Sequence, residues 1–236
     1  EMCIRDRDMA LEGPTLTGKI ISFRRPKKKA QISMEEAGKF QLPKEFINQK
    51  AIIIGGSRGL GEVVAKLLSA GGGGVRIGFN QGKQDAVNIC NEIKAAGEDA
   101  ECFQFNVLEQ PQPEKDILGT FIPTHLYYFA TPLIPQTQNQ SFNQEAYEEL
   151  CNFYIKGFQN TVSQFEGLVT KFFYPSTSFI NENPEMFLEY VAAKKKAEEI
   201  LGVMENNNNI FIFKPRLPKM ATDQTVSLLS LIHISE

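Results

Sequence analysis

Apolar residues in the middle of the chain alternate between short continuous runs and longer stretches with helical spacing. The run Ile52–Ile54 predicts a buried strand, and 62–70 carries valine and leucine on one helical stripe. The same alternation continues to residue 213. Further strands are expected at 75–79, 100–107, 125–130, 168–174 and 210–213, and further helices at 84–96, 142–164 and 187–204. Strands that alternate with helices in this way predict an α/β fold with a doubly wound parallel sheet.

Residues 9–49 precede this alternating region. The stretch 15–23 alternates loosely and predicts a strand, and Ser33 with Glu36 has the form of a capping box that opens a short helix. The basic run 24–29 is interrupted by proline and predicts a solvated turn, with an anion or acyl-carrier contact as the alternative. We therefore expect residues 9–49 to be an N-terminal extension or the tail of an upstream domain.

The two ends of the chain do not follow the pattern of the middle. Residues 1–8 and 227–236 resemble sequencing-adapter sequence translated into protein, and they are excluded from the fold prediction. The alternative at the C-terminal end is a native strand over 226–234, whose apolar pattern fits equally well. With the ends set aside, the alternating domain is expected to span residues 50–226 and to be incomplete at its C-terminus.

The composition narrows the functional classes. The 236-residue chain has a formal net charge of -3 and no basic stripe with interleaved aromatics, which argues against nucleic-acid binding. It contains no apolar run of 18 residues, so no transmembrane helix or membrane contact is expected. Its four cysteines are scattered and it has only two histidines, which argues against a zinc site or a disulfide framework. A reduced, cytoplasmic setting is therefore expected.

The first candidate site is the glycine-rich turn after Ile54. Glycines at 55, 59 and 61 form the spacing G-x-x-x-G-x-G between a strand and a helix. Glycines let the backbone approach a pyrophosphate, and a helix N-terminus offers unpaired N–H groups. The alternative is a tight turn that binds nothing. This spacing resembles the short-chain dehydrogenase/reductase family, which implies a Rossmann-like fold and cofactor contacts from Gly55, Ser57, Arg58, Gly59, Leu60 and Gly61.

The second candidate site is Tyr190 with Lys194. Positions four apart share a helix face, so the phenol and the ammonium can point at one ligand. A nearby ammonium favours the phenolate, so we expect the pKa of Tyr190 to lie below its ordinary value. A phenol tuned in this way can donate a proton to a developing alkoxide. The pair also matches the Y-x-x-x-K motif of the same family; the alternative is a surface tyrosine beside a lysine.

Hydroxyl side chains follow the strand expected at 168–174. In an open α/β sheet, ligands bind at the carboxyl ends of the strands. The resemblance implies that one hydroxyl in this run orients the substrate carbonyl, and Ser176 and Thr177 are the favoured candidates. The alternative is a turn in which these side chains cap the end of the strand.

The charges near the turn indicate the type of cofactor. An NAD enzyme places an acidic residue at the end of the second strand to hold the ribose 2′-hydroxyl. That end reads Phe79-Asn-Gln-Gly-Lys83 and has no acid, whereas Arg58 lies inside the glycine turn. Arginine can bind a phosphate bidentately, and Lys83 lies nearby. We therefore expect NADP to be preferred over NAD, with a solvent-facing arginine as the alternative.

Other positions depart from the family pattern. The resemblance implies further cofactor contacts from Asn80, Asn106, Val107, Ala130, Pro215 and Thr222. Asn106 stands where the family has aspartate, and the fourth strand ends in Tyr128-Phe-Ala-Thr131 in place of Asn-Asn-Ala-Gly. The asparagine of the catalytic tetrad aligns with Tyr154, and Asn152 lies nearly on the opposite face. These departures argue against a proton-relay water site like the one that the family has.

Together the motifs imply an NADP-dependent oxidoreductase that reduces a carbonyl to an alcohol. A 3-ketoacyl thioester is a plausible substrate by resemblance to ketoreductases, which also suggests a homo-oligomer or a fusion to other acyl-processing domains. The alternative is a non-catalytic NADP-binding sensor or structural domain of a larger acyl-processing protein.

Overall fold

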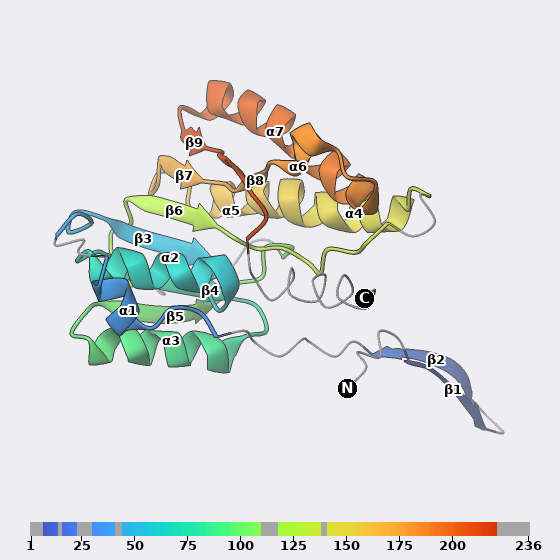
Figure 1. Ribbon diagram of the computed structural model, residues 1–236, viewed down its shortest axis with the longest axis horizontal. Helices are drawn as coiled ribbons and strands as arrows, with labels where there is room; N and C mark the ends of the chain where they lie inside the picture. Colours follow the sequence, from blue (N-terminus) through green and yellow to red (C-terminus); the bar gives the residue numbers. More distant parts are fainter. Residues whose placement is uncertain are drawn as a thin grey trace, which may run out of the picture.

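The fold is centred on one six-stranded parallel sheet, seen in a computed structural model of the chain (Figure 1). The structure describes residues 7–13, 16–22, 30–40, 44–109, 118–137 and 141–220. The strand order is β5-β4-β3-β6-β7-β9, and every neighbouring pair runs parallel. The strands are β3 (Lys50–Ile54), β4 (Gly74–Phe79), β5 (Ala100–Gln104), β6 (His125–Tyr128), β7 (Lys171–Phe173) and β9 (Phe211–Phe213).

The order of the strands reverses between β3 and β6. The chain runs outward from β3 through β4 to β5, then returns to place β6 on the other side of β3. A crevice forms at the carboxyl ends of the strands where the order reverses, and open α/β sheets bind ligands there. The topology therefore predicts a ligand site at the carboxyl ends of β3 and β6.

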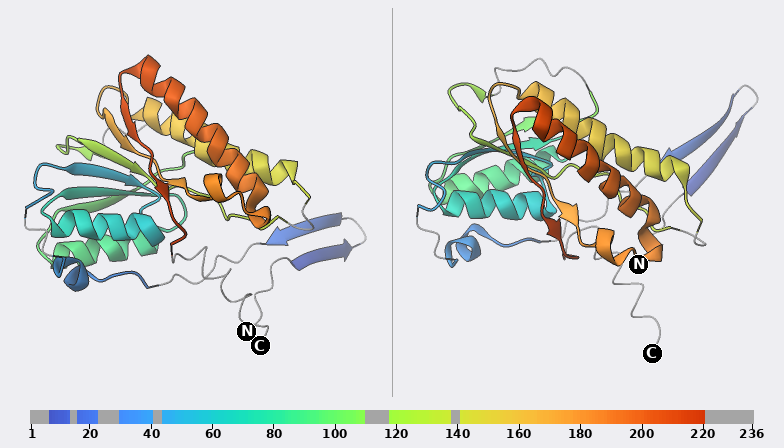
Figure 2. Two further views of the ribbon diagram at one scale, coloured as in Figure 1. Left: turned by 45° about the horizontal axis from the view of Figure 1, so that its top comes forward. Right: turned by 90° about the horizontal axis from the view of Figure 1, so that it is seen from above.

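Helices cover both faces of the sheet. One face carries α2 (Gly59–Ala70) and α3 (Lys83–Ala95), and the other carries α4 (Gln144–Cys151), α5 (Phe158–Gln164) and α7 (Leu188–Asn208). Figure 2 shows α7 lying beside α4 and α5. Strand β3 is buried on both sides: Ile53 packs toward α2 and α3, while Ile52 and Ile54 pack toward the other helices. A central parallel strand buried in this way reads as a continuous apolar run.

A π-helical segment interrupts the long helix expected at 142–164. This segment, η2 (Asn152–Gly157), joins α4 to α5. Two phenols, one at the end of β6 and one directly after β7, donate hydrogen bonds to its backbone: Tyr128 to the Phe153 carbonyl at 2.6 Å and Tyr174 to the Tyr154 carbonyl at 3.1 Å. Segments of π-helix inside α-helices are frequent at functional sites.

Residues 30–40 pack on the helical layer formed by α2 and α3. Helix α1 (Met34–Gly38) begins at Ser33, where the expected capping box with Glu36 is present. Lys66 on α2 donates to the Ile32 carbonyl at 2.9 Å, and the Met34 amide donates to Glu92 on α3 at 2.7 Å. The segment is therefore tied to the sheet domain by backbone groups as well as by the buried side chain of Met34.

A second, smaller pairing lies beyond β7 and β9. Strand β8 (Ser176–Thr177) pairs in parallel with β10 (Arg216–Leu217). Between β8 and α7 the chain forms two short helices, α6 (Phe179–Glu182) and the 3-10 turn η3 (Glu185–Phe187). Strands β8 and β10 follow β7 and β9 along the chain, so this pairing lies beyond the carboxyl ends of those two strands. It fixes the positions of Ser176 and Thr177.

The expected fold class is confirmed, and the differences are local. The third strand ends at Gln104 and the fifth begins at Lys171, so both are shorter than expected. The strand expected at 15–23 is β2 (Leu16–Ser22), and it pairs antiparallel with an unexpected strand β1 (Arg7–Gly13). The basic run 24–29 and the C-terminal stretch 221–236 lie outside the described residues, as do residues 110–117.

Candidate functional site

The glycine turn between β3 and α2 requires glycine for steric reasons. Gly55 and Gly59 have φ angles of +77° and +56°, in the left-handed region. A Cβ atom on Gly55 would lie 2.7 Å from the Ala130 amide nitrogen, and one on Gly61 would lie 2.6 Å from the Gly55 carbonyl oxygen. The turn is therefore packed closely against the end of β6 and leaves the first amides of α2 at the carboxyl edge. Such a cradle fits a diphosphate group.

Two other residues of the turn differ in exposure. Ser57 is buried, and Leu60 is half-buried at the start of α2. Arg58 stands at the N-cap position with an extended backbone. Its Nη2 atom lies 3.0 Å from Oδ2 of Asp85, in the first turn of α3. The arginine expected to meet a 2′-phosphate is thus ion-paired with Asp85, an acid that no sequence motif indicated.

The remaining residues expected to contact the adenosine half of a cofactor lie at the ends of β4, β5 and β6. Asn80 is exposed directly after β4, as is Lys83 at the start of α3. The Asn106 side chain is engaged within its own loop, since it donates to Glu109 at 2.7 Å and accepts from the Leu108 amide at 3.1 Å. Val107 is buried, and its carbonyl accepts a hydrogen bond from Asn160 at 2.9 Å.

Thr177 is the polar residue that most affects the phenol of Tyr190. Tyr190 lies in the first turn of α7 and is half-buried, and Thr177 belongs to β8. Burial raises the pKa of Tyr190, and the nearby hydroxyl of Thr177 opposes this shift only in part. The direction is the reverse of the expected one, because desolvation of the phenolate outweighs the groups that stabilise it.

Lys194 is a buried ammonium held mainly by aromatic rings. Its Nζ atom donates to the Pro175 carbonyl at 2.8 Å and lies 3.9 Å and 4.6 Å from the ring centres of Tyr154 and Tyr174. Burial lowers the pKa of Lys194 to about 7, although the charge of Glu198 opposes this shift. The lysine can therefore gain or lose a proton near neutral pH.

Ser176 belongs to a different hydrogen-bond network from Thr177. Its hydroxyl donates to Oε1 of Glu198 at 2.5 Å. Arg216 on β10 binds the same carboxylate bidentately, with Nε–Oε1 and Nη2–Oε2 distances of 3.0 Å and 2.7 Å, and also donates to Asn181 at 2.6 Å. Pro215 precedes this arginine, and its carbonyl accepts from the Ser176 amide at 2.9 Å. The hydrogen bond with Arg216 is the main reason that the pKa of Glu198 is lowered.

A chain of contacts joins the glycine turn to the tyrosine and the lysine. Ala130 touches Gly55, and the hydroxyl of the next residue, Thr131, lies 2.8 Å from the hydroxyl of Tyr154. The ring of Tyr154 in turn makes an edge contact with Tyr190 at 5.9 Å between centres. Tyr154 is buried and Asn152 is exposed, so the aromatic residue occupies the inner position where the family has asparagine.

The structure thus brings most of the expected site residues to one edge of the sheet. Tyr190 and Lys194 contact Tyr154, whereas Ser176 bonds to Glu198. Thr222 lies outside the described residues. Sequence reasoning missed three partners, namely Asp85, Glu198 and Arg216. Only Glu198 left a signal, because it lies four residues after Lys194 on the same helix.

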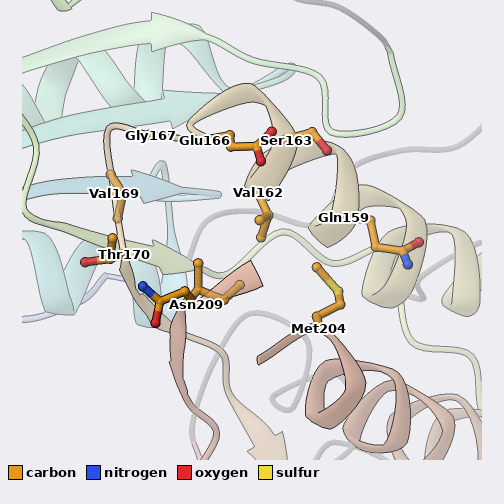
Figure 3. A pocket seen from close by; sticks show the side chains of 10 residues that line it. Gln159, Val162, Ser163, Glu166, Gly167, Val169, Thr170, Met204 and Asn209 are labelled. Carbon is orange, nitrogen blue, oxygen red and sulfur yellow. The ribbon is translucent and has the colours of Figure 1, made fainter. Parts of the chain in front are cut away.

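A hollow of about 560 Å³ lies elsewhere on the described part of the chain. Figure 3 shows it between the end of α5, the loop that leads to β7 and the end of α7, with Ser163, Glu166, Met204 and Asn209 among its lining residues. These residues lie at the amino end of β7, whereas Ser176 and Thr177 follow its carboxyl end. The hollow is therefore separate from the candidate site.

The described residues contain neither a membrane-spanning helix nor a cluster of metal ligands. None of the helices within them is both long and apolar enough to cross a membrane. The same residues hold no cluster of three or more histidine, cysteine, aspartate or glutamate side chains that could bind a metal ion.

Comparison with known proteins gives a likeness in structure but not in sequence. No protein-family model and no curated protein sequence matches the chain. Among solved structures, it is similar to FolM alternative dihydrofolate reductase 1 from Brucella suis in complex with NADP. The TM-score is 0.63 and the identity 14%, over 75% of this chain and 76% of that one.

Two further solved structures show the same likeness. An alcohol dehydrogenase from the archaeon Thermococcus sibiricus, complexed with 5-hydroxy-NADP, gives a TM-score of 0.66 at 18% identity, over 74% of this chain and 77% of that one. A short chain dehydrogenase from Burkholderia cenocepacia, in complex with NADP, gives 0.62 at 17% identity, over 75% and 76%. The order of strands, the glycine turn and these matches agree: the chain has the Rossmann-like fold of the short-chain dehydrogenases and reductases.

Proposed function

We propose that the protein is an NADP-dependent oxidoreductase that reduces a carbonyl group to an alcohol. The observation that carries this proposal is the position of Tyr190. It lies one helical turn before the buried Lys194 and contacts Tyr154, which is joined through Thr131 and Ala130 to the glycine turn. A phenol joined in this way to a nucleotide-binding turn is suited to proton transfer to a carbonyl oxygen. A 3-ketoacyl thioester is the substrate class that we propose.

The glycine cradle supports the choice of a dinucleotide. Gly55 and Gly61 let the turn pack against the end of β6 and against the start of α2, since a side chain on either would collide with backbone atoms there. The N-terminus of α2 then lies at this turn, where its first amides can bind a diphosphate. When bound, the nicotinamide supplies the hydride that reduces the carbonyl carbon. Arg58 and Lys83 are the cations placed to meet a 2′-phosphate, and the solved structures that contain NADP support this cofactor.

Within this proposal each polar group has a separate role. Tyr190 donates the proton to the carbonyl oxygen, and its raised pKa keeps the phenol protonated at neutral pH. Thr177 binds the carbonyl oxygen and the phenol together, because Ser176 is committed to Glu198. Lys194, when protonated, stabilises the phenolate that remains, and Tyr154 holds the ammonium where the family uses an asparagine.

Substitution of the phenol tests the proposal. Tyr190→Phe is expected to reduce NADPH oxidation with ketones and 3-ketoacyl thioesters by about 100-fold or more, because a positioned acid contributes that much. NADPH binding, followed by fluorescence, should be retained. Thr177→Val should reduce turnover strongly and Ser176→Ala only weakly.

Tyr127→Phe is a matched control, since that hydroxyl bonds to Gln49 and takes no part in the site. Full activity in Tyr190→Phe would contradict the assigned role.

The second candidate function is a non-catalytic NADP-binding sensor or structural domain of a larger acyl-processing protein. The aromatic residue Tyr154 at the inner position of η2 favours it, because its hydroxyl is already bonded to Thr131 and offers fewer hydrogen-bonding groups to a relay water than an amide does. Tight NADPH binding with no turnover on any carbonyl substrate would favour this function. Residues 50–226 as the functional domain, a cytoplasmic setting, and a homo-oligomer or a fusion to acyl-processing domains remain proposals.

A further inference from the structure

The ion pair between Arg58 and Asp85 joins the starts of two helices. Nη2 of Arg58 and Oδ2 of Asp85 lie 3.0 Å apart, and the two side chains are 20% and 26% exposed. Arg58 caps α2, which follows β3, and Asp85 lies in the first turn of α3, which follows β4. Since β3 and β4 are parallel neighbours, both helices begin at the carboxyl edge of the sheet.

This edge is where the proposed function places the adenosine ribose. In folds of this class the group beyond the end of the second strand decides whether a ribose 2′-hydroxyl or a 2′-phosphate is accepted. An acid directly after β4 is missing, but Asp85 brings a carboxylate to the same edge from the first turn of α3. The negative charge is stable there because a helix N-terminus favours it.

Arg58 and Asp85 favour opposite ligands. A 2′-phosphate attracts the guanidinium but is repelled by the carboxylate, and it can bind Arg58 fully only by displacing Asp85. A 2′-hydroxyl carries no charge and can donate a hydrogen bond to a carboxylate. Lys83, exposed at the start of α3, adds a second cation but leaves the Arg58–Asp85 pair in place.

We propose that Asp85 is a specificity-determining residue that competes with the 2′-phosphate for Arg58 and narrows the preference for NADPH over NADH. This inference rests on the proposed function, because it concerns the cofactor of that site. In the unmodified protein Arg58 is partly neutralised, so both dinucleotides bind.

The test compares cofactor affinities in four proteins. Dissociation constants for NADPH, NADH and adenosine 2′,5′-bisphosphate are measured by titration for the unmodified chain, Asp85→Asn, Arg58→Ala and Asp99→Asn. In Asp85→Asn, NADPH and the bisphosphate should bind about fivefold more tightly, the amount that a part-exposed ion pair is worth. NADH should bind equally or more weakly. Arg58→Ala should weaken NADPH and leave NADH nearly unchanged.

Asp99→Asn is the matched control. It removes one carboxylate that also lies 3.0 Å from an arginine, Arg76, but at the start of β5, on the opposite edge of the sheet. Its affinities should equal those of the unmodified protein. An unchanged NADPH to NADH ratio in Asp85→Asn would overturn the inference, as would weaker NADPH binding in that variant. If the folded, unmodified protein bound no dinucleotide, the proposed function itself would fail, which is a different result.

Discussion

Two buried lysines, Lys66 and Lys194, have opposite surroundings. Lys66 on α2 donates to three oxygens, those of Ile32, Glu62 and Glu92, at 2.9, 2.9 and 2.7 Å. Lys194 on α7 donates to one carbonyl and otherwise faces aromatic rings. Burial lowers the pKa of both, but the two carboxylates reverse the effect at Lys66, whose pKa is raised, while the pKa of Lys194 falls to about 7.

Lys66 therefore carries a structural charge, and Lys194 carries a reactive one. A buried ammonium that is fully paired holds elements together and stays protonated. A buried ammonium without a carboxylate in direct contact remains easy to deprotonate, which is costly for stability and is found where proton transfer matters. The protein contains one lysine of each kind: Lys66 lies on one side of the sheet and Lys194 on the other.

Removal of Lys66 is expected to have the largest effect on stability. Lys66→Met leaves Glu62 buried without its cation, which should lower the free energy of unfolding by about 3 kcal/mol. Urea unfolding measures this change. Lys39→Met is the control, because Lys39 pairs with Glu35 at the surface and should contribute less than about 0.5 kcal/mol. An equally small loss in Lys66→Met would remove the distinction between the two lysines.

Removal of Lys194 should affect activity and spare stability. In Lys194→Met a desolvated ammonium is replaced by an apolar group, so the free energy of unfolding should stay constant or rise by about 1 kcal/mol. Turnover of the proposed reaction should fall by about 100-fold. A loss of stability as large as that of Lys66→Met would contradict the comparison.

The pH dependence of stability sharpens the same experiment. The pKa of Lys194 falls from 10.5 to about 7 on folding, so between these values the unfolded state binds more protons and stability rises with pH. Lys194→Met should lose this rise. The contribution of Lys66 has the opposite sign: it is fully present below its unfolded pKa and is lost only as the pH passes its raised folded value.

The smallest expected effect is that of Glu198. Its charge opposes the fall in the pKa of Lys194, so Glu198→Gln should move the basic limb of the kcat/KM profile to lower pH. Ser176→Ala breaks the hydrogen bond to Glu198 without removing the charge, and it should leave that limb in place. A limb that moves equally in both variants would assign Glu198 a purely structural role.

Much of the fold was predictable because apolar periodicity reports burial directly. The run Ile52–Ile54 identified the central strand, and every strand of the main sheet followed from similar runs. The two-residue strands β8 and β10 were not foreseen, since their pairing joins segments far apart in the chain and leaves no local pattern. The π-helical segment was missed for a related reason: the phenols of Tyr128 and Tyr174, which are distant from it in the sequence, bond to its carbonyls.

The candidate site was predictable as motifs but not as a network. Spacing alone placed Tyr190 and Lys194 on one helix and the glycines in one turn, because both patterns are local. The pairing of Arg58 with Asp85 spans 27 positions, and no short-range rule connects them. The pKa of Tyr190 is raised, whereas the sequence predicted a lowered value, because the depth of burial depends on the whole fold.

The contacts that residues 30–40 make with α2 and α3 affect the choice of the first residue in an expression clone. An expression clone that started at Lys50 would keep the glycine turn and the motif of Tyr190. It would also discard the Ile32 carbonyl and the Met34 amide, two backbone partners of Lys66 and Glu92. The apolar residues of the core cluster that includes Met34 would then be partly exposed to solvent. A clone that starts before residue 30 retains these partners and is the better starting point for crystallisation and enzymology.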